Sequence, residues 1–537
     1  MGRWCMRSDF RREPQRRKER RGCRVGLFSA CSAALCASAV AFHLKPEARR
    51  WRCRLVGAAW PWLALLSEAQ LFAQAPPPER VALTNARIVP VVGEPIEKGT
   101  LLIERGKIAA VGVDLQVPFD ARVFDLSGKV LFPGTVDVHR AEGIDIPNEP
   151  RPVTPQLDVY DALDPSSLFF EESLRLGTSA VHVIPGNNTV IGGLGRVVRP
   201  IGMSVAEMTV AEGSFLKLSV SPQRDFDRMR QMATLRETFA ELWDYLDRLA
   251  ESRYEQKLKD EDRELDIVPL EARKRGRELI RAEDLDDKHR NVLRLLGGQV
   301  RVLGEAGPNI LEPLGAFVYC QKAMDVAHAV QLAREHGFLE RLVLVLGTEC
   351  YKAIEELKAA ARPVVLSAEF LHRETDPLTG EISEVFVPKK IADAGLLFAV
   401  EAGPDESLPE HMLTYQAARL VRGGVSRAEA LRAITINPAR ILGLEQRLGS
   451  LEPGKDANVV VYSGDPLDFT SLVEKVFIDG ILAYEREKDV RLQRLLVRQP
   501  TAEKQPEKPK EQTRPAETET RPAEPESQPA GEGGGGS

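Results

Sequence analysis

The sequence predicts an α/β fold in which parallel βα units lie between two β-rich ends. Short apolar runs separated by glycine, which are typical of strands, occupy residues 81–130 and recur at 449–484. Between them, strand-like runs alternate with helical stretches, the pattern of parallel βα units. A chain of 537 residues with 43% hydrophobic residues can bury a large core and form more than one domain.

Residues 1–78 are predicted to be a signal or targeting region. Two basic stretches are each followed by an apolar run, Val25–Phe42 and then Leu55–Leu66, and a small-residue cleavage motif follows at Ala73–Ala75. This order predicts export to the periplasm or the cell exterior, with maturation close after Ala75. Retention of Val25–Phe42 as a membrane anchor stays open as an alternative, although the run is barely long enough to span a bilayer.

Two further segments depart from the βα pattern. Leucine and phenylalanine recur from Leu235 to Leu249 at helical spacing on a charged background, which predicts an amphipathic helix. We interpret 223–297 as a helical insertion that packs on the main domain, with a partner-binding arm as the alternative. The Pro- and Glu-rich segment 491–537 is almost free of apolar residues and is predicted to be a disordered tail.

Charge and cysteine usage exclude two classes of protein. The net charge of −6 gives no sign of nucleic-acid binding. Five of the seven cysteines lie in the first 53 residues, so the rest of the chain carries no disulfide framework and no zinc-finger spacing. We interpret the remaining two, Cys320 and Cys350, as buried thiols.

The stretch from Leu131 to Ala141 carries the strongest chemical signal. A Pro-Gly turn leads into a predicted strand that contains Asp137 and His139. Side chains two positions apart on a strand point the same way, so an Asp-x-His-x-His pattern presents two histidines to one metal ion. In this chain Ala141 stands where the second histidine would be.

This stretch resembles the first metal-binding strand of the amidohydrolase superfamily. The segments Ala430–Gly443 and Gly449–Ala457 resemble those of the imidazolonepropionase-like and related bacterial amidohydrolases. The resemblance implies a distorted (β/α)8 TIM barrel at 130–444 beside a small β-sandwich formed by 79–129 and 445–490. It also implies the class of metal-dependent hydrolases that cleave non-peptide carbon–nitrogen bonds in cyclic amides.

The other metal ligands that the resemblance implies are missing from this chain. Apart from His139, the only clear ligand position that remains, the matching positions are held by Ala141, Tyr319, Gln321, Leu346 and Gly403. One imidazole does not hold a divalent ion in competition with water. We therefore expect no metal cofactor and a catalytically degenerate pseudoenzyme, with zinc or another divalent metal if that interpretation fails. Lys217 matches a mid-barrel lysine of the family and is interpreted as an ordinary solvated or paired amine.

A small polar ligand at the barrel mouth is the expected partner. The loop Pro185–Arg196 resembles one that borders the substrate pocket in relatives, and it lacks the Gly-Lys-Ser/Thr signature of a phosphate loop. For this loop, a structural turn and a ligand contact both stay open. For His182, a satisfied core histidine is favoured over one that faces the mouth. The candidate pocket residues are His182, Asn187, Asn188, Lys217, Tyr319, Gln321, Glu349 and Glu401.

Two alternatives to the degenerate hydrolase stay open. The first is an active hydrolase that is metal-free or that uses a relocated site, with the candidate set His139, His182, Glu349, Glu401 and Asp405. The second is an exported binding or scaffold protein that uses the barrel mouth or the insertion 223–297 to contact a protein partner.

Overall fold

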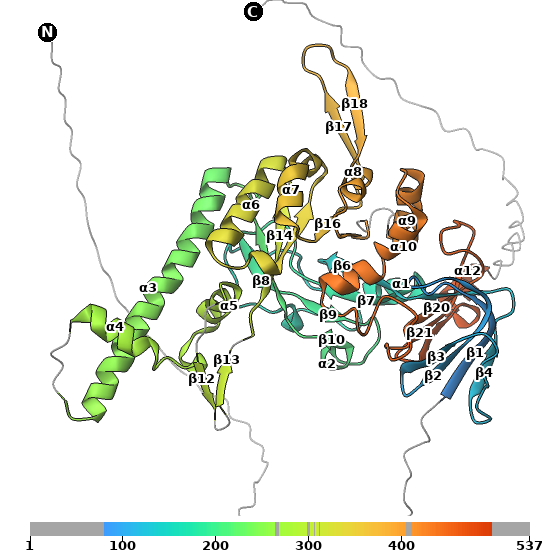
Figure 1. Ribbon diagram of the computed structural model, residues 1–537, viewed down its shortest axis with the longest axis horizontal. Coiled ribbons are helices and arrows are strands. Elements are labelled where there is room, and N and C mark those ends of the chain that lie inside the picture. Colours follow the sequence, from blue (N-terminus) through green and yellow to red (C-terminus); the bar gives the residue numbers. More distant parts are fainter. Residues whose placement is uncertain are drawn as a thin grey trace, which may run out of the picture. The chain divides into compact units, whose positions relative to one another are not determined.

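The computed structural model describes residues 80–263, 268–297, 301–304, 307–310, 312–403 and 411–496 (Figure 1). The region predicted at 1–78 and most of the tail predicted at 491–537 lie outside these residues. The start of that tail is a correction, because Val490–Leu496 form helix α12. The Asp489 carboxylate accepts the backbone N–H groups of the helix's first turn. In the described part of the chain, no helix combines the length and apolarity needed to cross a membrane.

Strands from both ends of the sequence form one eight-stranded sheet in the order β22-β21-β20-β5-β1-β2-β3, with β4 beside β1. Antiparallel pairing of β20 with β5 joins the two ends. A core of its own, which includes Leu83, Leu101 and Val459, lies against this sheet. The region predicted as a sandwich therefore has one continuous sheet. Its strands are β1 (Arg80–Ile88), β2 (Ile96–Glu104), β3 (Lys107–Gly112), β4 (Arg122–Asp125), β5 (Val130–Pro133), β20 (Val459–Tyr462), β21 (Val473–Ile478) and β22 (Ile481–Glu485).

The middle of the chain contains two groups of parallel strands, which confirms the α/β class. β6 pairs with β7, and the other group has the order β11-β14-β15-β16-β19. Between the groups, β8 runs antiparallel to β11, and β9 runs antiparallel to β7 and β10. Among the described residues these ladders do not close into one ring. The strands are β6 (Thr135–Arg140), β7 (Thr178–Val183), β8 (Ile191–Leu194), β9 (Arg196–Val198), β10 (Thr209–Ala211), β11 (Phe215–Ser219), β14 (Gly315–Cys320), β15 (Leu342–Leu346), β16 (Val364–Leu366) and β19 (Phe398–Val400).

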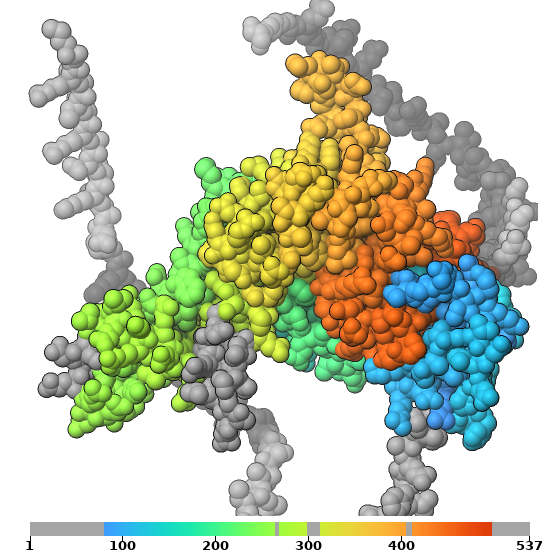
Figure 2. Space-filling view, viewed as in Figure 1, coloured from blue at the N-terminus to red at the C-terminus, as the bar shows by residue number. Residues whose placement is uncertain are grey.

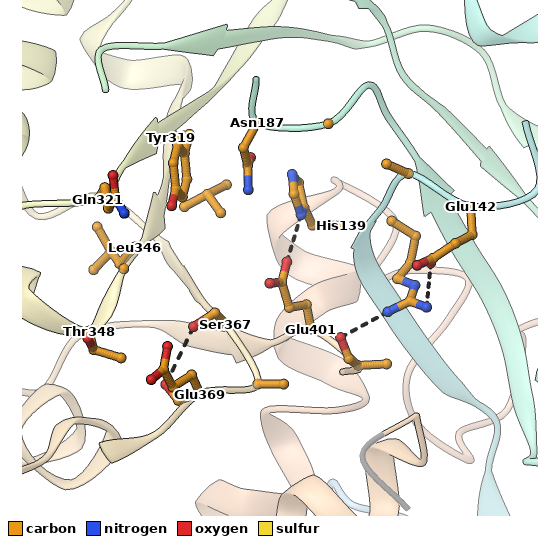
Figure 3. A pocket seen from close by; sticks show the side chains of 17 residues that line it. His139, Glu142, Asn187, Tyr319, Gln321, Leu346, Thr348, Ser367, Glu369 and Glu401 are labelled. Carbon is orange, nitrogen blue, oxygen red and sulfur yellow. Dashed lines mark hydrogen bonds and ion pairs between the residues drawn. The ribbon is translucent and has the colours of Figure 1, made fainter. Parts of the chain in front are cut away.

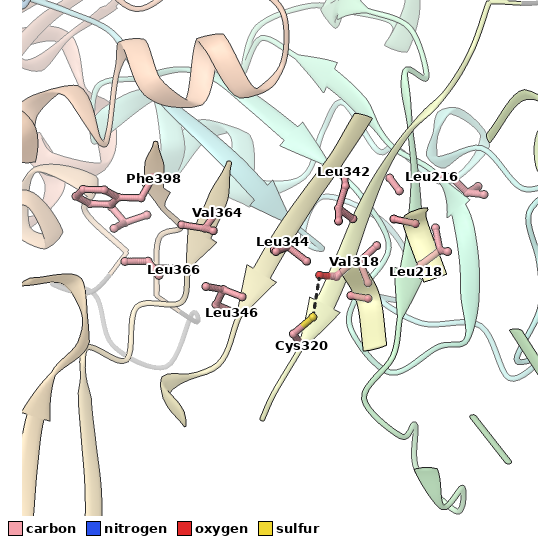
Figure 4. Packing of buried hydrophobic residues seen from close by; sticks show 14 of the residues in the cluster. Leu216, Leu218, Val318, Cys320, Leu342, Leu344, Leu346, Val364, Leu366 and Phe398 are labelled. Carbon is pink, nitrogen blue, oxygen red and sulfur yellow. Dashed lines mark hydrogen bonds between the residues drawn. The ribbon is translucent and has the colours of Figure 1, made fainter. Parts of the chain in front are cut away.

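Alternation along the parallel strands separates two apolar clusters. On β15, Leu342, Leu344 and Leu346 belong to the large cluster shared with the helices (Figure 4). Val343 and Val345 belong to the other cluster, which the inner faces of the strands share. The main-domain helices are α1 (Leu168–Arg175), α2 (Val205–Met208), α6 (Ala323–Glu335), α7 (Ile354–Ala360), α8 (Val387–Asp393), α9 (Leu413–Arg422), α10 (Arg427–Arg432) and α11 (Ile436–Ile441).

The segment 223–297 contains a long helix, α3 (Arg228–Asp260), followed by α4 (Pro269–Arg277) and α5 (Asp287–Leu295) (Figure 1). The first half of α3 buries Leu235, Phe239 and Leu242 in the large cluster. Its second half forms a small separate core with α4, which includes Tyr254 and Ala272. A hairpin of β12 (Arg301–Gly304) and β13 (Gly307–Ile310) follows. The periodicity from Leu235 to Leu249 thus marks the half of α3 that packs on the main domain.

A hairpin that the sequence analysis did not predict projects from the parallel strands. It consists of β17 (Leu371–Thr375) and β18 (Ile382–Phe386), and its tip projects beyond the other described elements in both views (Figures 1 and 2). Along β17, His372 contacts Thr348 and Glu374 pairs with Lys352. Leu378 at its tip is 94% exposed. Elsewhere, Cys320 and Cys350 are free and buried, as their interpretation as buried thiols expected.

Candidate functional site

A cavity of about 470 Å³ opens where β6, β14, β15, β16 and β19 end (Figure 3). Because parallel strands present their carboxyl ends at the same edge, side chains far apart in sequence meet there. Its walls combine carboxylates, amides and hydroxyls with a few apolar groups. The principal lining side chains are His139, Arg140, Glu142, Asn187, Tyr319, Gln321, Leu346, Thr348, Ser367, Glu369 and Glu401.

A chain of hydrogen bonds runs from Lys217 through His139 to Glu401. Lys217 Nζ lies 2.7 Å from His139 Nε2, and His139 Nδ1 lies 2.7 Å from Glu401 Oε2. Lys217 also donates to Asn187 Oδ1 at 2.6 Å. An ammonium group can only donate, so Nε2 accepts, and the proton on Nδ1 is donated to Glu401. The imidazole in this arrangement is neutral.

Local sequence explains how these side chains reach one another. In β11, Leu216 and Leu218 enter the large apolar cluster, so alternation places Lys217 on the opposite face. Lys217 is 0% exposed, although it lies in the middle of a paired strand. β6 departs from this alternation, since Val138 packs in the inner cluster and the ring of the next residue, His139, stacks 6.2 Å from that of Phe317 in the same cluster. The pairing of β6 with β7 is irregular between Asp137 and Arg140.

Burial shifts the pKa of each of the three groups in the direction that favours its uncharged form. Desolvation raises the pKa of Glu401 to about 7, although the charges of Arg140 and Lys217 act against this shift. Desolvation lowers the pKa of Lys217 to about 7, opposed by the carboxylate of Glu401. The pKa of His139 falls well below its usual value because of burial and the positive charges of Lys217 and Arg140.

Arg140 fixes the segment that follows β19. Its guanidinium donates to the carbonyl oxygens of Ala402 and Gly403 at 2.9 and 2.8 Å. It also forms an ion pair with Glu142 and lies 3.6 Å from Asp137 Oδ2. Burial raises the pKa of Asp137 to about 7, although the charge of Arg140 acts to lower it. These contacts place Glu401 beside His139.

Comparison with known proteins identifies the family. The Amidohydrolase family profile matches residues 410–484. Amidohydrolase tasK of Hapsidospora irregularis is 25% identical over 417 residues, which are 72% of this chain and 40% of the relative. An amidohydrolase structure from Thermotoga maritima MSB8 has a TM-score of 0.60 at 29% identity, covering 76% of this chain and 100% of that one. The chain belongs to the amidohydrolase superfamily.

Other relatives agree on the superfamily and differ in extent. Imidazolonepropionase of Geobacillus sp. (strain WCH70) is 23% identical over 435 residues, which are 71% of this chain and 89% of the relative. Adenine deaminase 1 of Carboxydothermus hydrogenoformans is 42% identical over 78 residues, only 12% of its length. The chain thus spans less than half the length of tasK and of adenine deaminase 1.

The side chains of this site do not fit the divalent metal that the superfamily implies. The ring nitrogen His139 Nε2 already accepts from the ammonium of Lys217, and a divalent cation there would meet a positive charge. Tyr319, Gln321 and Leu346 line the cavity without completing a ligand set. Among the described residues, no three His, Cys, Asp or Glu side chains gather closely enough to hold an ion.

The structure brings most of the candidate residues together. His139, Asn187, Tyr319, Gln321 and Glu401 line the cavity, and Lys217 lies directly behind His139. The interpretation of Lys217 as a solvated amine is wrong, because the side chain is fully buried, whereas the paired alternative agrees with its contacts.

Three candidates lie elsewhere. His182 is buried, with Nδ1 2.9 Å from the carbonyl oxygen of Val138, as a satisfied core histidine should be. The Asn188 side chain accepts the backbone N–H of Arg224. Glu349 does not line the cavity. Since Asp405 lies outside the described residues, only His139 and Glu401 of the relocated set meet, and that set is not assembled in the described part of the chain.

Several lining residues were not predicted from the sequence. Arg140 and Glu142 lie one and three residues after His139, so their position beside the metal-strand motif was an available signal. Thr348 follows the end of β15, while Ser367 and Glu369 follow β16. Functional side chains often follow the carboxyl ends of parallel strands, and this rule would have selected these three residues.

Proposed function

We propose that this chain is a metal-independent member of the amidohydrolase superfamily that binds a small polar ligand and has lost metal-dependent hydrolysis of carbon–nitrogen bonds. The proposal includes a distorted (β/α)8 barrel, in which β8 and β9 lie between the two groups of parallel strands. The observation that carries it is the contact of 2.7 Å between Lys217 Nζ and His139 Nε2. That contact places the buried amine of Lys217 where a catalytic metal would have to bind.

Metal-dependent hydrolysis requires a set of ligands that this site lacks. A metal-bound water reaches a pKa near 7 only when about three protein ligands hold the ion and leave one position open. Here His139 and Glu401 bind each other, and the third group in the chain is a cation. The remaining side chains around the cavity suit hydrogen bonding to an organic ligand better than ion coordination.

Metal analysis with an activity assay tests the proposal. Purified full-length protein would be dialysed without chelator, measured for zinc, manganese and iron, and assayed on hydantoin and an imidazolone. We expect substoichiometric metal and no hydrolysis above background. One metal per chain together with hydrolysis of either cyclic amide would overturn the proposal.

A second candidate function is metal-free hydrolysis, which the position of Glu401 favours. Its carboxyl lines the cavity, and burial raises its pKa to about 7, close to the value that suits a general base at neutral pH. Turnover that persists in EDTA and is lost in Glu401→Gln would support this function. Turnover that is equal in wild type and Glu401→Gln would exclude that role for Glu401.

A further inference from the structure

We propose that the cavity binds a small organic cation, such as an amidinium, guanidinium or primary ammonium compound. This inference rests on the proposed function, since it names the ligand class of the same metal-independent site. It follows from how the charged side chains around the cavity are engaged, from the acceptors that remain open and from the size of the space.

The two cationic groups at the site are engaged with protein partners. Arg140 donates to Ala402 and Gly403 and pairs with Glu142. Lys217 is fully buried, and its ammonium contacts His139 and Asn187. Neither group presents a free positive charge to the cavity, so an anionic ligand would find no available counter-ion among them.

A third cationic group, the guanidinium of Arg419, lies behind the cavity wall. Arg419 donates to the carbonyl oxygen of Ala368 and to Gln416, and it stacks over the ring of Phe370. It does not line the cavity. A ligand in the cavity would therefore not contact the charge of Arg419.

The carboxyl groups, in contrast, retain open acceptors. Glu401 uses only Oε2 to accept from His139, which leaves Oε1 without a partner in the described part of the chain. Glu369 lines the same cavity with an exposed side chain, and no ion pair to it is found among the described residues. Figure 3 shows both side chains at the cavity. Two carboxyl groups at one cavity favour a ligand that brings positive charge and several N–H donors.

The neutral groups fit the same ligand class. The side chains of Tyr319, Gln321 and Thr348 offer oxygen atoms to a donor, and Val345 and Leu346 provide an apolar surface. The cavity of about 470 Å³ admits a molecule with a single ring. A planar cation with an apolar ring would therefore place its donors toward the carboxyl groups and its ring against the apolar wall.

Three probes of nearly equal shape test the sign of the charge. Benzamidinium is cationic, benzamide is neutral and benzoate is anionic. Their binding to the full-length protein would be measured by calorimetry at low and high sodium chloride. We expect benzamidinium to bind roughly tenfold more tightly than benzamide, with an affinity that falls as salt rises. Equal or tighter binding of benzamide or benzoate, or no binding of benzamidinium, would overturn the inference.

A pair of matched variants assigns the effect to the cavity. Glu369→Gln should weaken benzamidinium binding roughly fivefold and leave benzamide unchanged, because it removes one charge and keeps the side-chain size. Glu356→Gln on the exposed face of α7 removes the same charge away from the cavity and should have no effect. Both side chains are exposed, so both variants should fold. Equal effects of the two variants would overturn the assignment.

Metal analysis separates this inference from the proposed function. If the protein contains no zinc and hydrolyses no cyclic amide, but does not prefer benzamidinium, the inference on ligand class fails alone. If the protein retains stoichiometric zinc and hydrolyses a cyclic amide, the proposed function fails. The charge preference is then measured on the same sample after chelation.

Discussion

Lys217 Nζ and His139 Nε2 lie 2.7 Å apart, and both side chains are buried. The His139 nitrogen that could face a metal ion therefore accepts a hydrogen bond from a cation supplied by the protein itself. Glu401 contacts the other ring nitrogen, so the row consists of a cation, a neutral ring and a carboxyl group. In this hydrogen-bonded chain the charge of Lys217 balances that of Glu401 without a metal ion.

Reversing the charge at Lys217 should create a metal site. In Lys217→Glu the repelling cation is replaced by a carboxylate beside His139 Nε2 and Asn187 Oδ1, the two atoms that the ammonium contacts, which gives three nitrogen or oxygen donors to a zinc ion. We expect zinc to be retained after dialysis and to raise the melting temperature of the variant. Without zinc, the variant should be less stable than wild type by roughly 2–5 kcal/mol, because the buried carboxyl groups have lost their cation.

Lys217→Met is the matched control for that experiment. It removes the positive charge without adding a ligand, so it should retain no more zinc than wild type. Zinc retention by Lys217→Glu that does not exceed that of wild type would show that Lys217 does not decide metal binding.

Leu346 should be intolerant of the histidine that the family carries at the matching position. It is 2% exposed and belongs to the cluster that β15 shares with the helices (Figure 4). We expect Leu346→His to lower the free energy of unfolding by about 2–4 kcal/mol, measured with urea, because it replaces apolar packing by a buried polar ring. Leu378→His at the exposed hairpin tip makes the same change and should have little effect. Similar losses in the two variants would contradict this account of Leu346.

The site could be predicted from the sequence where strand alternation determines the direction of a side chain. His139 followed from its motif. Strand alternation also accounts for Cys320, which lies between Tyr319 and Gln321 and packs in the large cluster while those two line the cavity. The contact between Lys217 and His139 could not be predicted, because it joins strands that are 78 residues apart and depends on side-chain reach.

Glu401 shows a second limit of sequence reasoning. The family register placed the missing acidic ligand at Gly403, and that position indeed has no carboxyl group. The carboxyl of Glu401 nevertheless reaches His139, because Arg140 holds the backbone of Ala402 and Gly403. Glu401 was named as a candidate pocket residue from the sequence, but its hydrogen bond to His139 could not be predicted by matching residue types position by position. The hairpin β17–β18 was missed for a different reason, since its two strands pair with each other and lie outside the βα pattern.

Export can be tested on the protein from its natural host. The order of basic, apolar and small-residue segments predicts a mature chain that begins close after Ala75. N-terminal sequencing of protein from the exported fraction should therefore start near Pro76. Recovery of a chain that begins at Met1 in the soluble cytoplasmic fraction would contradict export.

His182 should make the free energy of unfolding depend on pH below neutrality. Burial lowers its pKa from 6.5 to about 3, and its Nδ1 lies 2.9 Å from the carbonyl oxygen of Val138. Because the folded pKa is depressed, the unfolded chain binds a proton first as the pH falls. The contribution of His182 to stability is therefore fully present above pH 6.5 and is lost as the pH falls from 6.5 toward 3.

Replacement of the imidazole measures this effect. Each pH unit in the window can cost up to about 1.4 kcal/mol from this one residue. Urea denaturation of wild type and of His182→Asn, which keeps a side-chain N–H donor and cannot be protonated, should be compared between pH 7 and pH 4. We expect the wild type to lose stability more steeply on acidification than the variant. Parallel curves would mean that His182 is not the group whose burial makes acid destabilise the fold.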